Sequence, residues 1–266
     1  MEKKPIWDFI QIGTSLKYLE DTQPWYAVIT KGGVRSNIKS LLRDIQFSGL
    51  EVTDRACQEL YEFLEILNEI EDDKRWLTGE ESQKLRDNLK LIRHTLNAET
   101  RGKFAFIPTE KRYDQDKLMN SIDKIFPENI FSKLSPMAQF DISEAGKCIA
   151  LERPTAASFH LMRGLESILR TYHHHFIKKD HKNRPWGPLL NDLKGINSEI
   201  KPEKITIDHL FNIKDNFRNP TQHPEKIYTS DEAQDLLNLC IEVIARMINE
   251  ISQSCTQGAQ IGAHKI

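Results

Sequence analysis

The spacing of hydrophobic residues along the C-terminal half of the chain predicts a set of amphipathic helices. The strongest segment begins at Asp231 and continues to Ile251, with apolar residues recurring about every 3.6 positions. A second strong segment runs from Pro154 to Tyr172. Weaker segments with the same period lie at 142–151, 189–196 and 210–217. We therefore expect residues 138–252 to form a compact helical bundle.

Residues that start and stop helices support this pattern. Thr229 and Glu232 have the spacing of a capping box, in which a hydroxyl and a carboxylate satisfy free N–H groups at a helix start. Pro154 suits a first helical turn because that position has no hydrogen bond to lose. Pro220 disfavours helical geometry at the residue before it, so the 210–217 segment is predicted to end near Asn219.

The N-terminal half, residues 1–126, gives weaker signals. Helical spacing recurs at 53–67 and again at 78–96, where Thr78 and Glu81 form another capping-box pattern. Residues 26–30 and 103–107 are short β-type runs beside Gly and Pro. We expect a linker at 127–136 and a flexible tail at 253–266. The predicted fold class is mainly α, with a C-terminal helical bundle and an N-terminal helical region carrying minor β.

Composition and charge exclude several classes of protein. The 266 residues contain 37 Lys+Arg and 39 Asp+Glu, which excludes a globally basic nucleic-acid binder but leaves room for a local basic patch. No apolar run approaches the ~18–20 residues of a membrane span, and no apolar core follows the N-terminal charges, so we expect a cytoplasmic protein. The cysteines at 57, 148, 240 and 255 contain no C-x-x-C pair, so we expect neither a disulfide framework nor a structural zinc site.

One segment, residues 217–224, combines residues suited to phosphodiester chemistry. It places Arg218 and His223 five positions apart, at a predicted helix end that leads into a turn bounded by two prolines. The prolines restrict the backbone and so reduce the entropy lost in holding the two side chains in place. An arginine fork matches phosphate oxygens, and a histidine can take and give a proton near neutral pH.

The spacing alone is a weak signal. With 14 Arg and 9 His in this chain, the expected number of Arg–His pairs at this spacing is roughly 0.5 by chance. A second pair, Arg170 and His175, occurs in the sequence. Arg170 lies in the middle of a predicted helix, where an offset of five positions rotates the two side chains well apart. Arg218 instead stands at a helix end with the polar Asn219 beside it, so the context favours this pair.

With this motif and its flanking helices, residues 138–252 resemble a HEPN domain, the helical bundle of many prokaryotic RNase toxins and abortive-infection proteins. The family signature is Arg, a polar residue, three variable residues and His. Arg218 to His223 matches it, with Asn219 as the polar residue. The helix that begins at Pro154 and the amphipathic helix after the motif follow the order found in the family. The resemblance covers under half of the chain.

The resemblance implies a metal-independent endoribonuclease, with no cofactor, acting as a toxin or anti-phage defence effector. His223 would be general base or acid for attack of an RNA 2′-OH on the adjacent phosphate, while Arg218 stabilises the charged transition state and Asn219 orients the phosphate or the histidine. The family pattern also implies a homodimer with two motifs in one cleft, and products with 2′,3′-cyclic phosphate and 5′-OH ends. Some members carry a Tyr two positions after the His that an antitoxin modifies. Here that position is Glu225, and the nearest tyrosine is Tyr228.

Other interpretations of the motif stay open at this point. Arg218 could bond the last carbonyls of its helix, where a cation is favourable, and His223 could be an ordinary turn residue. The bundle could also be a non-catalytic module that dimerises and binds RNA or a protein partner. A third alternative is the regulatory subunit of a toxin–antitoxin or defence system, in a stable complex with its partner.

A second candidate site is the basic segment after the second strong helix. Lys178, Lys179, Lys182 and Arg184, set against Asp180, give a local charge of +3. Such a segment could follow an RNA backbone, or it could simply be solvated surface. It is the predicted RNA-binding surface.

Two further groups of polar residues lie on or near the same predicted helix. His173–His175 and His181 suggest a metal site, but consecutive helical residues point about 100° apart and cannot chelate one ion, so no metal site is predicted. Arg163 and Glu166 could form a local ion pair, or they could face the cleft and position His223.

Overall fold

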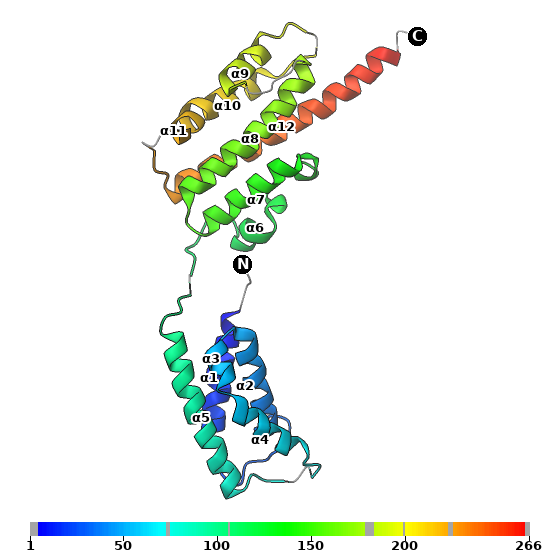
Figure 1. The fold of residues 1–266 in the computed structure, drawn as a ribbon. Helices are drawn as coiled ribbons and strands as arrows, with labels where there is room; N and C mark the ends of the chain where they lie inside the picture. The colour runs from blue at the N-terminus through cyan, green and yellow to red at the C-terminus, as the bar shows by residue number, and fades with distance from the viewer. Residues whose placement is uncertain are drawn as a thin grey trace. The chain divides into compact units, whose positions relative to one another are not determined.

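The computed structural model describes residues 5–72, 75–105, 107–178, 184–198, 200–222 and 226–263, with side chains described up to residue 256. The chain divides into two compact units, Met1–Phe106 and Ile107–Ile266, and each is described by itself (Figure 1). All named secondary-structure elements of the described residues are helices, which confirms the predicted mainly α class. Across these ranges no helix is long and apolar enough to cross a membrane.

The first unit packs its helices around one apolar core that includes Leu16, Ile38, Phe63 and Leu89, each at most 2% exposed. The predicted helix at 53–67 is interrupted by a turn near Cys57, which makes it two helices. The capping box predicted at the 78–96 helix is present. The helices are α1 (Ile6–Glu20), α2 (Val34–Ser48), α3 (Glu51–Arg55), α4 (Gln58–Asn68) and α5 (Gly79–Thr100).

The two predicted strands of this unit are wrong as far as their residues are described. In the first, Ala27 forms a single antiparallel bridge with Trp76, and the chain then turns at Gly33, whose N–H donates to the Thr30 carbonyl at 2.7 Å. In the second, Phe104 is 82% exposed and lies in a segment without regular structure. A strand needs a neighbour for its backbone groups, and neither segment has a ladder beyond the one bridge.

The second unit is a helical bundle in which α8 lies between α7 on one side and α9 and α10 on the other, with α12 along its length (Figure 1). Leu165, Leu169, Leu237 and Ile244 are fully buried in its core. The helices are α6 (Gln115–Asn120), α7 (Pro136–Ala150), α8 (Pro154–Ile177), α9 (Trp186–Gly195), α10 (Lys204–Ile213), α11 (Asn219–Gln222) and α12 (Ser230–Ala263). Two 3-10 turns, η1 (Ile122–Ile125) and η2 (Phe131–Lys133), precede α7, and a π-helical turn, η3 (Lys214–Arg218), joins α10 to α11.

The second unit is longer at both ends than predicted. It begins at Ile107, not after a boundary at 126, because Leu118, Ile122, Phe126 and Ile130 are buried in its core. The predicted linker at 127–136 therefore includes η2 and part of that core. The predicted flexible tail at 253–266 is instead helical up to the end of α12, where Ser254 is 8% exposed and contacts α8.

Candidate functional site

Arg218 and Asn219 lie within a helix and not at the predicted end of one. Asn219 has helical backbone angles, φ −63° and ψ −50°, and the helix continues through Pro220 to Gln222. Pro220 has no N–H to donate, and the π-helical turn just before it shifts the hydrogen-bond pattern by one residue. Such turns are rare and recur at functional sites. The turn explains how the helix passes the proline that was predicted to stop it.

The Arg218 side chain is partly buried and has no binding partner within the described ranges. Its Nε atom is fully buried and makes no hydrogen bond there, and its guanidinium forms no ion pair. No bond to a carbonyl of its own helix is present, so the capping role considered for Arg218 is not seen among these residues. A buried donor left unsatisfied costs about 1–3 kcal/mol. The terminal nitrogens of the guanidinium are not among the fully buried atoms, so they are the part of the side chain that could bind an anion such as a phosphate oxygen.

His223 lies outside the described residues, together with Pro224 and Glu225. Its predicted role as general acid or base stays a prediction. What the structure describes is how the chain is held on both sides of this short segment, at Thr221 and from Lys226 onward.

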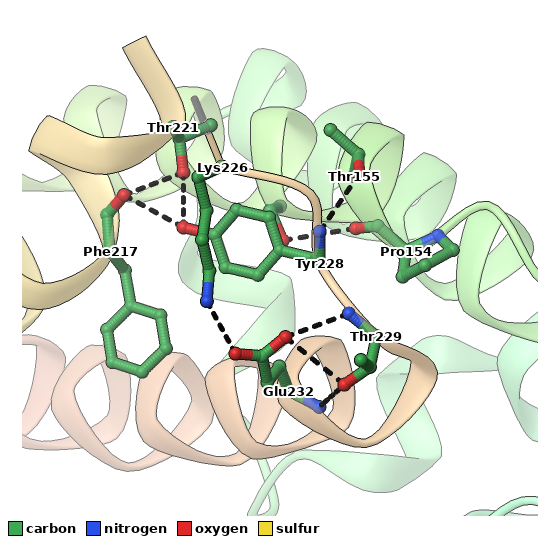
Figure 2. Close-up of polar contacts among 9 residues, drawn as sticks. Pro154, Thr155, Phe217, Thr221, Lys226, Tyr228, Thr229 and Glu232 are labelled. Carbon is green, nitrogen blue, oxygen red and sulfur yellow. Dashed lines mark hydrogen bonds and ion pairs between the residues drawn. The ribbon is translucent and has the colours of Figure 1, made fainter. Parts of the chain in front are cut away.

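Two hydroxyl groups and one backbone carbonyl form a compact network at Phe217, the residue before Arg218 (Figure 2). The carbonyl oxygen of Phe217 accepts hydrogen bonds from Thr221 Oγ1 at 2.6 Å and from the Tyr228 hydroxyl at 3.0 Å. The two hydroxyl oxygens are themselves 2.7 Å apart. Because two hydroxyl protons serve three contacts, the protons are shared within the network. The network ties the residue before Arg218 to the chain that follows His223.

The chain after His223 is fixed to α8 and to the start of α12 (Figure 2). The Tyr228 N–H donates to Thr155 Oγ1 on α8 at 3.2 Å. The predicted capping box is present, since Thr229 Oγ1 accepts from the Glu232 N–H at 3.2 Å and the Thr229 N–H donates to Glu232 at 2.8 Å. Lys226 donates to the other oxygen of Glu232 at 2.5 Å, and this bond lowers the pKa of Glu232.

Tyr228 is a structural anchor that the sequence interpretation missed. It is 3% exposed, and the Lys226 ammonium lies 5.0 Å from the centre of its ring. A buried hydroxyl that already bonds two groups is a poor target for a modifying enzyme. The sequence signal for an anchor was an aromatic residue directly before the capping box at Thr229.

Of the four cations predicted to bind RNA, the structure describes two, Lys178 and Arg184. Lys179 and Lys182 lie outside the described residues, and Lys178 is an exposed residue that ends α8. Arg184 was expected to contact RNA, but its guanidinium donates to Asp192 on α9 at 2.6 Å. This bond, with a second from a buried histidine, lowers the pKa of Asp192 to about 2. The Arg184 charge is therefore compensated within the protein.

The histidines of α8 contact different neighbours. His173 is fully buried and lies 3.0 Å from Asp192, whereas His175 lies 2.6 Å from Ser254 on α12. In the part of the chain that the structure describes, no group of three His, Cys, Asp or Glu side chains could hold a metal ion. The cysteines are free, and burial raises the pKa of the Cys57 thiol to about 12.

Arg163 and Glu166 do not pair with each other. Arg163 Nε donates to Asp141 on α7 at 3.0 Å, and the same fully buried carboxylate lies 3.0 Å from His160 Nδ1. Glu166 accepts from Arg170 at 2.6 Å and from the Trp186 indole at 2.8 Å. Sequence reasoning did not find the Asp141 cluster, because its members come from two helices and only Arg163 had been singled out.

The site thus consists of Arg218 at the end of the π-helical turn and Asn219 at the start of α11, beside a segment anchored by Tyr228. Arg218 is half-buried and has no partner among the residues that the structure describes. A cation held in this way can bind a phosphate and stabilise negative charge on it. Comparisons of the chain with family models, curated proteins and solved structures find no match.

Proposed function

We propose that the protein is a metal-independent endoribonuclease whose catalytic residues are Arg218, His223 and Asn219. The observation that carries the proposal is the Arg218 side chain. It is half-buried on a backbone that hydrogen bonds fix, and its Nε donor has no partner within the described ranges. A cation in this position is ready to meet a substrate anion, and the motif that follows it would supply a group able to move a proton.

In this proposal the RNA 2′-OH attacks the adjacent phosphorus, and the bond from phosphorus to the 5′ oxygen breaks. The imidazole of His223 takes the proton from the 2′-OH or gives one to the departing 5′ oxygen, as its ordinary pKa allows near neutral pH. Arg218 offsets the extra charge on the phosphorane-like transition state. Asn219 orients the phosphate. The products are a 2′,3′-cyclic phosphate and a 5′-OH, so no water is consumed in this step, and the proposal assigns no role in it to a metal ion.

A single histidine cannot be the base and the acid at the same moment. The proposal therefore includes a homodimer that brings two copies of the motif to one cleft. It assigns the enzyme to the cytoplasm as a toxin or anti-phage defence effector, with RNA as substrate and with an antitoxin or defence-system partner as its control.

The test is cleavage of total RNA and tRNA by the full-length protein in EDTA. We expect wild-type cleavage to survive EDTA, and Arg218→Ala and His223→Ala each to abolish it. The matched control is Arg246→Ala, because Arg246 belongs to the same unit but bonds Glu242 one turn away at 3.1 Å. Equal activity of Arg218→Ala and Arg246→Ala would overturn the assignment of Arg218.

A second candidate function, a non-catalytic dimeric module, is favoured by a different observation. Met137 and Phe140 on α7 and Phe159 on α8 are 56%, 54% and 48% exposed. Large apolar side chains exposed on neighbouring helices are typical of a protein–protein contact. Absence of cleavage by wild type, together with a dimer that Phe140→Asp dissociates in light scattering, would favour the module over the enzyme.

A further inference from the structure

A cavity of about 450 Å³ opens between α9 and α10 in the second unit. Its size is that of a small-ligand site. Three lysines line it over an apolar floor. The lysines are Lys194, Lys201 and Lys204, and the floor consists of Leu193, Ile196 and Ile207. None of these residues belongs to the motif around Arg218.

The cavity carries an excess of positive charge. Within the described ranges none of its three ammonium groups forms an ion pair, whereas Lys214 lies 2.6 Å from Asp215. Among the described lining residues the carboxylate is that of Asp208, so three cations face one anion there. Like charges gathered around one cavity repel each other, and a bound anion removes that repulsion.

The walls of the cavity are fixed by the buried carboxylate of Glu250 on α12. Glu250 is 8% exposed and accepts a hydrogen bond from the Glu203 N–H at 3.0 Å and one from the Thr206 hydroxyl at 2.5 Å. These bonds hold the start of α10, where Lys204 is placed. On the other wall, the Lys194 ammonium lies 5.6 Å from the centre of the Phe211 ring. The backbone that carries Lys204 is therefore fixed before any ligand binds.

We propose that this cavity holds a phosphate group of a single RNA strand. Lysine ammoniums bind phosphate as point charges, the apolar floor accommodates part of a nucleoside, and Asp208 can accept a hydrogen bond from a ribose hydroxyl. Lys204 and Arg218 are separated by about 21 Å along the helix at 1.5 Å per residue, so the held phosphate is not the one that is cleaved. The inference depends on the proposed function in one respect, namely that the phosphate belongs to RNA.

The test measures binding without cleavage. A fluorescent single-stranded DNA has the same phosphates as RNA but no 2′-OH, so its binding by fluorescence anisotropy is independent of the cleavage chemistry. The variant is Lys194→Gln with Lys201→Gln and Lys204→Gln in one full-length chain. The matched control is Lys117→Gln with Lys124→Gln and Lys133→Gln, three exposed lysines of the same unit with the same change of charge. All substituted side chains are exposed, so both proteins are expected to fold.

We expect the cavity variant to bind the DNA roughly tenfold or more weakly than the control. The slope of log affinity against log salt should fall by about 0.7, because one phosphate contact on a single strand is lost. Calorimetry with inorganic phosphate tells whether the bound phosphate belongs to a nucleic-acid strand or to a small molecule. Binding of free phosphate that depends on the three lysines would support the phosphate site, with a small phosphate compound as its ligand. Equal DNA and phosphate binding by the two triple variants would overturn the inference, even if wild type cleaves RNA in EDTA.

Discussion

The Tyr228 hydroxyl donates a 3.0 Å hydrogen bond to the carbonyl oxygen of Phe217, the residue directly before Arg218. This contact joins the two sides of the segment that contains His223. The same carbonyl also accepts from Thr221 at 2.6 Å, so the backbone next to Arg218 is held by two side chains from opposite ends of the segment. The backbone next to Arg218 therefore depends on a buried network that reaches Tyr228, outside the motif.

Tyr228→Phe removes one hydroxyl from this network and leaves the ring in place. We expect the free energy of unfolding of the second unit to fall by about 1 kcal/mol, measured by chemical denaturation. Under the proposed function, kcat should fall while KM stays near its wild-type value, because the lost bond supports Arg218 and does not touch substrate. Tyr113→Phe is the control, since the Tyr113 hydroxyl bonds Asn238 at the surface at 3.2 Å. Equal kinetic effects of the two variants would contradict the positioning role.

The Arg184–Asp192 bond predicts a pH dependence of stability. The folded pKa of Asp192, about 2, lies below its ordinary value of 3.8, so the folded protein binds fewer protons in this range. The stabilisation is therefore fully present above about pH 4 and is lost as the pH falls toward 2. Denaturation at several pH values should show a gap between wild type and Arg184→Gln that closes over this window. Arg153→Gln, at an exposed arginine, should show no such gap. A gap independent of pH would refute the link to Asp192.

Asp141 predicts a second stability effect. Its fully buried carboxylate accepts from Arg163 and lies beside His160, so Asp141→Asn should lower the free energy of unfolding by about 1–3 kcal/mol. Arg163→Gln should cost less, because the Arg163 side chain is 62% exposed and its charge is screened by water. Thermal and urea denaturation measure both. The reverse order would show that the carboxylate is not the centre of this cluster.

Two glycines test how closely the segment before α7 packs against the bundle. A Cβ atom added at Gly146 would lie 2.6 Å from the Leu118 carbonyl oxygen, whereas one added at Gly187 meets nothing within 4 Å. Gly146→Ala should destabilise the second unit by about 1–3 kcal/mol. Gly187→Ala should leave it unchanged or stabilise it by up to about 1 kcal/mol. If both substitutions are neutral by urea denaturation, residues 107–133 do not belong to this core as described.

The helices with strong local signals could be predicted from the sequence. The segments that became α8 and α12 have long apolar faces, and Thr229 with Glu232 marks the start of α12 by bonds between near neighbours. These features depend on residues a few positions apart, which a pattern can detect. The end of α12 could not be placed, because the contact of Ser254 with His175 joins residues far apart in the chain.

The partners of the candidate site residues could not be predicted for the same reason. Arg184 was predicted to contact RNA, but it bonds Asp192, which is reached only after the chain turns into α9. Pro220 was expected to end a helix, but the π-helical turn before it lets the helix continue, and such a turn has no simple sequence pattern. The motif residues themselves could be named, whereas the lysine-lined cavity between α9 and α10 arises from packing alone.

The most direct test of the proposed chemistry is mass spectrometry of the product ends from one RNA oligonucleotide incubated with the protein in EDTA. The proposal predicts a 2′,3′-cyclic phosphate on one product and a 5′-OH on the other. It also predicts that a 2′-deoxy substitution at the cleaved position prevents the reaction and that Arg218→Ala gives no product. Products with a 5′-phosphate, or cleavage at the 2′-deoxy position, would contradict it.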